Sequence, residues 1–385
     1  MAAPRERSSI LPREAESALQ ALALNWVDVI DAKKMEITPL TGGMTNDIFK
    51  CCWQTGDGGN PRKVLVRIYG DARANVFFDR EYEIRAFECI SRLGQGPRLL
   101  GSFPTGRIEE FLDARTLSPP DLKNPEISAK IAAKLWEFHH LDIPGPRQPN
   151  LWMRLRKWLG TALALCPNVE VAGFRLECIE DEINYLEKMV SREGESVGFC
   201  HNDLQYANMM FQDEDKCLTI IDYDCSNYDP IAFDIANHFN EMAGNYHSDT
   251  PHILDYSKYP DYEERQRFVK EYLKSSRKMV RDGEVEKLLK HIEKYTLVSH
   301  VHWSLWSIIS KHVNDMDFDY MDYAKQRFQR YRLLKPLLLN VESPYSSNGA
   351  DWNCTRDFHN STKSSELNAN MHDACHFTKF QCNYE

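Results

Sequence analysis

Two acids and one amide stand close together in the stretch from Gly198 to Glu241: Asp203, Asn208 five residues later, and Asp222. Magnesium prefers hard oxygen ligands, so the oxygens of an Asn amide and an Asp carboxylate suit it. A second carboxylate can accept the proton of a hydroxyl that attacks a phosphate. Positioning and charge stabilisation supply most of what phosphoryl transfer needs from a protein. The residue types therefore predict that Asn208 and Asp222 hold Mg²⁺ and that Asp203 is the base.

The elements around these residues predict how they meet. Residues 209–211 (MMF) and 218–221 (LTII) are short apolar runs joined by a polar turn, which is typical of a β-hairpin. This hairpin would bring Asn208 and Asp222 together. Protein kinases show the same five-residue spacing from a catalytic Asp to a metal-binding Asn, followed by a second metal-binding Asp. The alternative is that these polar residues only cap loops, but the hairpin and the Ile-Asp-Tyr after it favour the phosphoryl-transfer interpretation.

Upstream, five strand-like runs and one helix predict a small lobe over residues 35–115. The runs MEITPL and NDIFKCCWQ flank a glycine-containing turn, whose backbone amides could approach a phosphate; a plain hairpin is the alternative. Arg67 is a charge inside the apolar run KVLVRIYG, where it needs a partner unless it faces solvent on an edge strand. Its planar fork suits a nucleotide phosphate. We predict that Glu83, on the helix expected over residues 75–93, pairs with Arg67.

Residues 116–195 read as helical, and a further helix is expected through residues 231–242. Asp234 on that helix could brace the catalytic loop, the segment around Asp203, by hydrogen bonds. The adjacent His139 and His140 do not share a helix face, so they are interpreted as structural rather than as a metal site.

An aromatic group follows near the end of the helical region. Trp303 and Trp306 lie three residues apart on one helix face, and Tyr320 and Tyr323 come just after them. Core packing is the ordinary explanation of such a pair. Together with Tyr246 and the carboxylate of Glu241, these rings could instead form a box that binds an ammonium group by cation–π attraction.

Composition limits the class of protein. The chain has 385 residues, 42% of them hydrophobic, and a formal net charge of −10. No Lys/Arg-rich block appears, which argues against nucleic acid or an anionic membrane as a partner. No secretory signal, bilayer-length apolar run or CxxC pair is present. We therefore expect a reduced, cytoplasmic enzyme without membrane insertion.

The expected organisation has four parts. Residues 1–34 are a polar leader and a helix through residues 18–30, residues 35–115 the nucleotide-binding lobe, and residues 116–341 the helical lobe with the catalytic loop. Residues 342–385 are rich in Ser, Asn and Asp, which predicts a disordered tail. Some residues of this tail could imitate a zinc site, although their spacing fits no standard finger: Cys354, His359, His372, Cys375, His376 and Cys382.

Together these segments resemble the choline/ethanolamine kinase family over roughly residues 36–340. The most specific matches are HNDLQYAN (201–208), IDYDCSNYDPIAFDIANHFNE (221–241), HWSLW (302–306) and YMDYA (320–324). The YMDYA segment and residues 247–260 are most similar to plant choline kinases. The family is similar to aminoglycoside phosphotransferases and protein kinases, which implies an α+β bilobal fold with a small, mainly β N-lobe and a large helical C-lobe.

The resemblance implies ATP- and Mg²⁺-dependent phosphorylation of choline, the first step of the CDP-choline route to phosphatidylcholine. Family members are often dimers, so a homodimer is a further expectation. The expected nucleotide-binding residues are Thr41, Gly42, Gly43, Met44, Thr45, Asn46, Asp47, Arg67, Glu83, Glu110, Phe111, Arg115 and Gln205. The expected choline-binding residues are Asp203, Gln205, Glu241, Tyr246, Trp303, Trp306 and Tyr323.

Three alternatives remain at this point. Ethanolamine could be the main substrate, or the protein could be a catalytically weak, kinase-like binding protein. The second alternative is prompted by Ala207 and Cys225, which stand where the family usually has Gly and an aromatic residue, and by the unusual tail. Aminoglycoside phosphorylation is the third, but the paired tryptophans argue against it because an aminoglycoside pocket is expected to be rich in acids.

Overall fold

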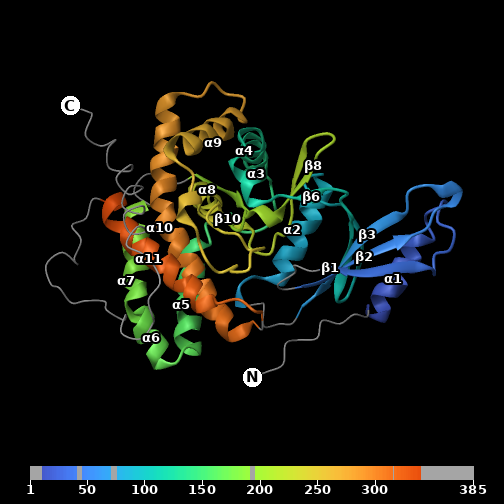
Figure 1. Cartoon of the computed structure of the whole chain (residues 1–385), viewed down its shortest axis with the longest axis horizontal. Helices are drawn as coiled ribbons and strands as arrows, with labels where there is room; N and C mark the ends of the chain where they lie inside the picture. The colour runs from blue at the N-terminus through green and yellow to red at the C-terminus, as the bar shows by residue number, and fades with distance from the viewer. Residues whose placement is uncertain (1–10, 41–45, 71–75, 191–195, 315, 340–385) are drawn as a thin grey trace.

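The computed structural model describes residues 11–40, 46–70, 76–190, 196–314 and 316–339. In these residues a sheet-based lobe, at the right of Figure 1, adjoins a larger lobe built mainly from helices. Both lobes contain apolar side chains fully removed from water. The N-terminal leader, the glycine turn at residues 41–45 and the tail beyond residue 339 lie outside the described part of the chain.

The sheet of the smaller lobe has five strands in the order β1-β2-β3-β5-β4, and its neighbouring strands are antiparallel. The five expected strands are confirmed. Their bounds are β1 (Met35–Leu40), β2 (Asn46–Trp53), β3 (Arg62–Tyr69), β4 (Leu99–Phe103) and β5 (Gly106–Glu110). Because β3 lies at the centre of the sheet, it is not an edge strand.

Helix α1 (Arg13–Ala23) covers one face of this sheet. It buries Ala15, Leu19 and Ala23, which recur every four residues and pack with the inward side chains of β2 and β3. The helix expected over residues 18–30 therefore begins and ends earlier than predicted. Just after its end, the Asn25 side chain donates to the carbonyl of Ala21, and the backbone N–H groups of Asn25 and Trp26 bond the carbonyls of Leu22 and Ala23.

Helix α2 (Arg80–Arg92) lies between the two lobes (Figure 1). The Asp79 side chain caps it by accepting a hydrogen bond from the backbone N–H of Tyr82. Its buried face carries Glu83, Phe87 and Ile90, at the three- and four-residue spacing of one helix stripe. The carboxylate of Glu83 is therefore buried on the helix that lies between the two lobes.

The larger lobe is organised around α10 (Asp282–Val313), a helix of 32 residues. It packs against α8, whose eleven residues are all buried, and against α11. In a helix buried on every side, most polar side-chain atoms need partners inside the protein. The remaining bounds are α3 (Pro119–Lys123), α4 (Pro125–His139), α5 (Leu151–Leu165), α6 (Asn168–Phe174), α7 (Ile179–Val190), α8 (Ile231–Glu241), α9 (Tyr262–Lys274) and α11 (Tyr320–Leu339).

Two small sheets hold the loops between these helices. Strand β7 (Val197–Cys200) pairs with β10 (Asn227–Pro230), and β6 (Arg115–Thr116) pairs with the hairpin of β8 (Met209–Gln212) and β9 (Cys217–Ile220). The predicted hairpin is confirmed. Among the described helices, none combines the length and apolarity needed to cross a bilayer.

Two glycines provide a stability test of this packing. A methyl group at Gly198 would lie 2.7 Å from the carbonyl oxygen of His139, so Gly198→Ala should destabilise the protein by about 1–3 kcal/mol. In Gly160→Ala the added methyl meets no described atom within 4 Å, and helix α5 should gain roughly 0.5–1 kcal/mol. Urea unfolding should shift in opposite directions for the two variants; a neutral Gly198→Ala would contradict the close approach of α4 and β7.

Candidate active site

The loop after β7 is held by one buried carboxylate. Asp234, in the first turn of α8, accepts hydrogen bonds from the backbone N–H groups of His201 (2.8 Å) and Asn202 (2.7 Å). It also contacts His139 Nε2 at 3.0 Å. Burial alone would raise the pKa of Asp234, but the hydrogen bond and charge of His139, with the contribution of His201, lower it. The brace expected at Asp234 is confirmed.

Asn202 turns the chain toward the catalytic position. Its φ of 64° lies in the left-handed region, which Asn adopts more readily than most residues. Its side-chain nitrogen donates to the carbonyl of Cys225 (3.0 Å) and to Asp229 Oδ2 (2.8 Å). Asp229 is paired in turn with Arg154. The loop is therefore fixed from two sides before Asp203 is reached.

The three residues singled out from the sequence come together at this loop. Asn208 Nδ2 donates to the carbonyl (2.8 Å) and to Oδ2 (3.0 Å) of Asp203. The N–H of Ile221 donates to the carbonyl of Asn208 at 2.9 Å, which places Asp222 directly beside it. Asp222 has a φ of 67°, a left-handed conformation at the end of the hairpin. The predicted closeness of Asn208 and Asp222 is confirmed.

The electrostatics of this loop suit a cation. Burial raises the pKa of Asp203 well above its usual range, and the charges of Glu241 and Asp222 raise it further. Both hydrogen bonds from the Asn208 side chain to Asp203 are made by its nitrogen, which orients the amide, and its Oδ1 is an acceptor that can bind a cation. Carboxylate and amide oxygens that repel one another at close range fit Mg²⁺, which would offset the shared negative charge.

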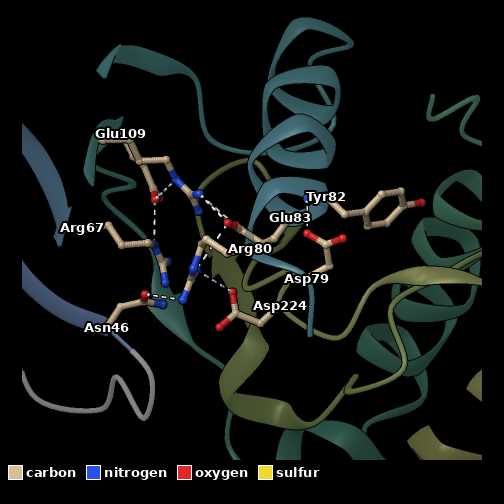
Figure 2. A network of polar contacts seen from close by, with 9 residues as sticks. Asn46, Arg67, Asp79, Arg80, Tyr82, Glu83, Glu109 and Asp224 are labelled. Carbon is tan, nitrogen blue, oxygen red and sulfur yellow. Dashed lines mark hydrogen bonds and ion pairs between the residues drawn. The ribbon is translucent and has the colours of Figure 1, made fainter. Parts of the chain in front are cut away.

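The predicted pairing of Arg67 with Glu83 is wrong. Arg67 is buried in β3, and its Nε lies 2.8 Å from Glu109 Oε1 on the neighbouring strand (Figure 2). Glu83 instead pairs with Arg107, at 2.8 Å. Sequence reasoning missed this because Arg107 and Glu109, on β5, place two further buried charges between the helix and the strand.

Arg80 joins the two lobes. Its guanidinium lies 3.0 Å from Asn46 Oδ1 on β2 and 3.4 Å from both Glu83 and Asp224 (Figure 2). Asp224 lies two residues after Asp222. The end of the N-lobe sheet and the segment after the hairpin are thus tied through one cation, which sequence reasoning did not identify.

The structure describes only some of the other residues that were expected to bind nucleotide. The predicted nucleotide contacts at Thr41–Thr45 fall outside the described residues, whereas Asn46 is buried at the start of β2 and is followed there by Asp47. Phe111 lies within 6 Å of the ammonium groups of Lys50 and Lys63. The backbone N–H of Glu110 donates to the backbone carbonyl of Arg98. The side chain of Arg115 is paired with Asp121 and Asp213, and Gln205 Oε1 accepts from the N–H of Ala207.

The aromatic residues do gather in one cluster. Trp303 and Tyr323 are buried with Ala243 and Leu254, and the partly exposed rings packed on them are Tyr246, Tyr256, Trp306 and Phe318. The ring centroids of Trp303 and Trp306 are 5.2 Å apart in an edge-to-face arrangement. Trp306 also lies 5.8 Å from Tyr320.

Glu241 stands at this cluster but is already engaged. It accepts from Tyr246 Oη and from Arg327 Nη2, each at 2.5 Å, and Arg327 is fully buried. Arg327 also donates to Tyr323 Oη. Sequence reasoning missed Arg327, although its position four residues after Tyr323 on one helix face was a usable signal.

A single amide connects the catalytic loop to the aromatic cluster. Asn237 Nδ2 donates to the carbonyl of Asn202 at 2.9 Å, while its Oδ1 accepts from Trp303 Nε1 at 2.5 Å and from Ser299. Asn237 is fully buried. The base and the rings are therefore positioned by the same helix, α8.

The two adjacent histidines have separate structural partners. His139 is buried between Tyr272 Oη and Asp234, and His140 bonds the carbonyl of Trp136. The structural interpretation of this pair is confirmed.

Comparison with known proteins agrees with this geometry. The family model for choline/ethanolamine kinase matches residues 37–332. The chain belongs to the choline/ethanolamine kinase family. The Arabidopsis thaliana protein named Probable choline kinase 2 is 57% identical over 329 residues, covering 86% of this chain and 94% of that protein. The Arabidopsis Probable ethanolamine kinase is 34% identical, covering 88% and 89%.

A solved structure extends the agreement to the fold. The choline kinase of Cryptosporidium parvum superposes on this chain with a TM-score of 0.70 at 27% identity, covering 83% of this chain and 96% of that one. The α+β, protein-kinase-like bilobal fold expected from the sequence is confirmed, and aminoglycoside phosphotransferases share it.

The Asp234 brace can be tested with a near-isosteric change. In Asp234→Asn an amide N–H₂ must face a backbone N–H of the loop, which should cost about 1–3 kcal/mol of stability and lower kcat. Asp261→Asn is the matched control, because Asp261 caps α9 at the surface and Asn caps equally well. Urea unfolding and steady-state kinetics measure both; an Asp234→Asn enzyme as active and stable as the control would contradict the brace.

Proposed function

We propose that this protein transfers the γ-phosphate of ATP to the hydroxyl of choline, giving phosphocholine. The observation that carries the proposal is the link between a partly buried acid and an aromatic cluster: Asn237 donates to the carbonyl of Asn202, next to Asp203, and accepts a hydrogen bond from Trp303 in the cluster. A hydroxyl held at Asp203 would therefore belong to a molecule whose other end reaches the rings. Choline has a hydroxyl at one end and a quaternary ammonium at the other.

Each part of the site has a role in this proposal. Asp203 accepts the proton of the choline hydroxyl as its oxygen attacks the phosphate. Asn208 and Asp222 would hold Mg²⁺, which when bound offsets the charge of the phosphate oxygens. The segment from residue 41 to Asp47, with Arg67, would bind the phosphates of ATP, and Gln205 would lie between the two substrates.

The environment of Glu241 favours choline over ethanolamine. Its oxygens already accept hydrogen bonds from Tyr246 and Arg327, so little acceptor capacity remains for the N–H groups of a primary ammonium. A trimethylated ammonium has no N–H to satisfy and gains from the ring faces. The named relatives agree, since the Arabidopsis choline kinase is more similar to this chain than the ethanolamine kinase is.

The setting of the reaction is part of the same proposal. Phosphocholine formed here would enter the CDP-choline route of phospholipid synthesis, and the enzyme would work in the cytoplasm as a homodimer. A coupled assay of ADP release with choline and ethanolamine side by side tests the substrate preference directly.

Replacing the base should stop turnover. Asp203→Ala should lower kcat by roughly 10²–10⁴-fold because the hydroxyl loses its proton acceptor. Glu214→Ala, an exposed acid in the turn of the same hairpin, is the matched control and should be unchanged. Choline-dependent ADP release measures both. Near-normal turnover of Asp203→Ala would refute its role, and ATP binding without any ADP release by the unaltered protein would indicate a non-catalytic binding protein.

Removing one ring of the aromatic cluster should weaken the binding of choline but not of ATP. Trp306→Ala loses a contact worth about 0.5–2 kcal/mol to a bound quaternary ammonium, which corresponds to a rise of roughly 2- to 30-fold in the KM for choline. The KM for ATP should stay within about twofold. Trp136→Ala, on α4, controls for the loss of a large ring. Equal increases in both KM values would argue that Trp306 only packs the fold.

A further inference from the structure

A second group of ligating side chains lies outside the site described so far. Cys166 follows the last turn of α5, Glu170 is on α6, and His312 is in the last turn of α10. Cys166 Sγ and His312 Nε2 are 3.6 Å apart, and His312 Nε2 and Glu170 Oε2 are 3.1 Å apart. All three ligand atoms lie within 4.8 Å of one another. Three elements thus present sulfur, nitrogen and oxygen to one point.

These separations are close to the edges of a zinc coordination tetrahedron. Zinc binds sulfur at about 2.3 Å and nitrogen or oxygen at about 2.0–2.2 Å. At the tetrahedral angle, sulfur and nitrogen ligands are then about 3.5 Å apart and nitrogen and oxygen about 3.3–3.4 Å apart. The observed 3.6 Å and 3.1 Å differ from these values by a few tenths of an ångström. An ion could therefore be bound with little movement of the three side chains.

The surroundings also suit a divalent cation. Cys166 is buried, whereas Glu170 and His312 reach solvent, so an ion has a path in and a water molecule can complete the tetrahedron. A thiolate and a carboxylate together carry the two negative charges that neutralise Zn²⁺. Among the ion pairs of the described residues, the one that involves Glu170 is with His312, so no Lys or Arg competes for its carboxylate there.

A reactive cysteine is a poorer explanation of this group. Burial and the neighbouring Glu170 raise the pKa of the Cys166 thiol to about 11, so the free side chain is protonated and weakly nucleophilic. Metal binding reverses this by displacing the thiol proton, which also makes the affinity increase with pH.

A comparison within the same molecule shows what distinguishes the group. His139, Cys200 and Asp234 also lie within 4.8 Å of one another. Both nitrogens of His139 are bonded, Asp234 accepts two backbone N–H groups, and the Cys200 thiol donates to the carbonyl of Asp229. That group is fully buried and internally satisfied, so it offers no place for an ion.

We propose that Cys166, Glu170 and His312 form a zinc site, with water as the fourth ligand, that fastens the end of α5 to α6 and α10. The three ligands are the types that zinc prefers, and bridging three helices would stabilise their junction. The site is separate from the phosphoryl-transfer loop, so it does not depend on the proposed function.

The test uses the full-length protein and cobalt(II) as a spectroscopic substitute for zinc. The unaltered protein should bind one equivalent of metal at this site, and the cobalt form should show a thiolate-to-cobalt charge-transfer band. Cys166→Ser should abolish the band and His312→Ala should weaken metal binding at least tenfold. Cys217→Ser, at an exposed free cysteine of the β8–β9 hairpin, is the matched control and should leave the spectrum unchanged.

The outcomes separate this site from the cysteines and histidines of the tail. A band that persists unchanged in Cys166→Ser would place the cobalt elsewhere and overturn the proposal, as would the absence of any band in the unaltered protein. Zinc should also raise the Tm of the unaltered protein and of Cys217→Ser, but not of Cys166→Ser. Circular dichroism of each variant shows whether it is folded, so a loss of the band through misfolding is recognised; His312→Ala then provides the independent second measurement.

Discussion

The arrangement of the active site depends on the carboxylate of Asp234. Two successive backbone N–H groups, of His201 and Asn202, have no helix or strand to satisfy them, and an unsatisfied buried amide is costly. One carboxylate accepts both, and it can remain charged in the interior because His139 also bonds it. With these amides fixed, Asn202 can take its left-handed conformation and Asp203 can face Asn208.

Helix α8 positions the other parts of the site as well as the loop. Asp234, Asn237 and Glu241 recur at three- and four-residue intervals, so they lie on one face of the helix. The first holds the loop, the second joins the loop to Trp303, and the third stands among the rings. A fully buried helix with three polar residues on one face is expensive to fold unless each is satisfied, and here each one is bonded. The position of the catalytic loop relative to the aromatic cluster is therefore fixed by one helix.

Much of this could be predicted from the sequence, because local patterns encode it. The hairpin around Asn208 and Asp222, the five strands and the brace at Asp234 follow from apolar periodicity and motif spacing. The partner of Arg67 could not be predicted, since Arg107 and Glu109 on another strand compete for the same charges. The pairing of Arg327 with Glu241 joins residues far apart in the sequence, and only the packing of both α8 and α11 against α10 decides it. Local periodicity also placed the first helix too late in the chain, since α1 spans Arg13–Ala23 and not residues 18–30.

The position of Arg80 has a consequence for large-scale breathing of the molecule. Separating the lobes would break the contact of this cation with Asn46 on one side or with Asp224 on the other. Separation of the lobes therefore costs free energy whichever of the two contacts is lost. Amide hydrogen exchange in β2 and in the segment after β9 should then be correlated, as in one cooperative unit rather than two independent ones.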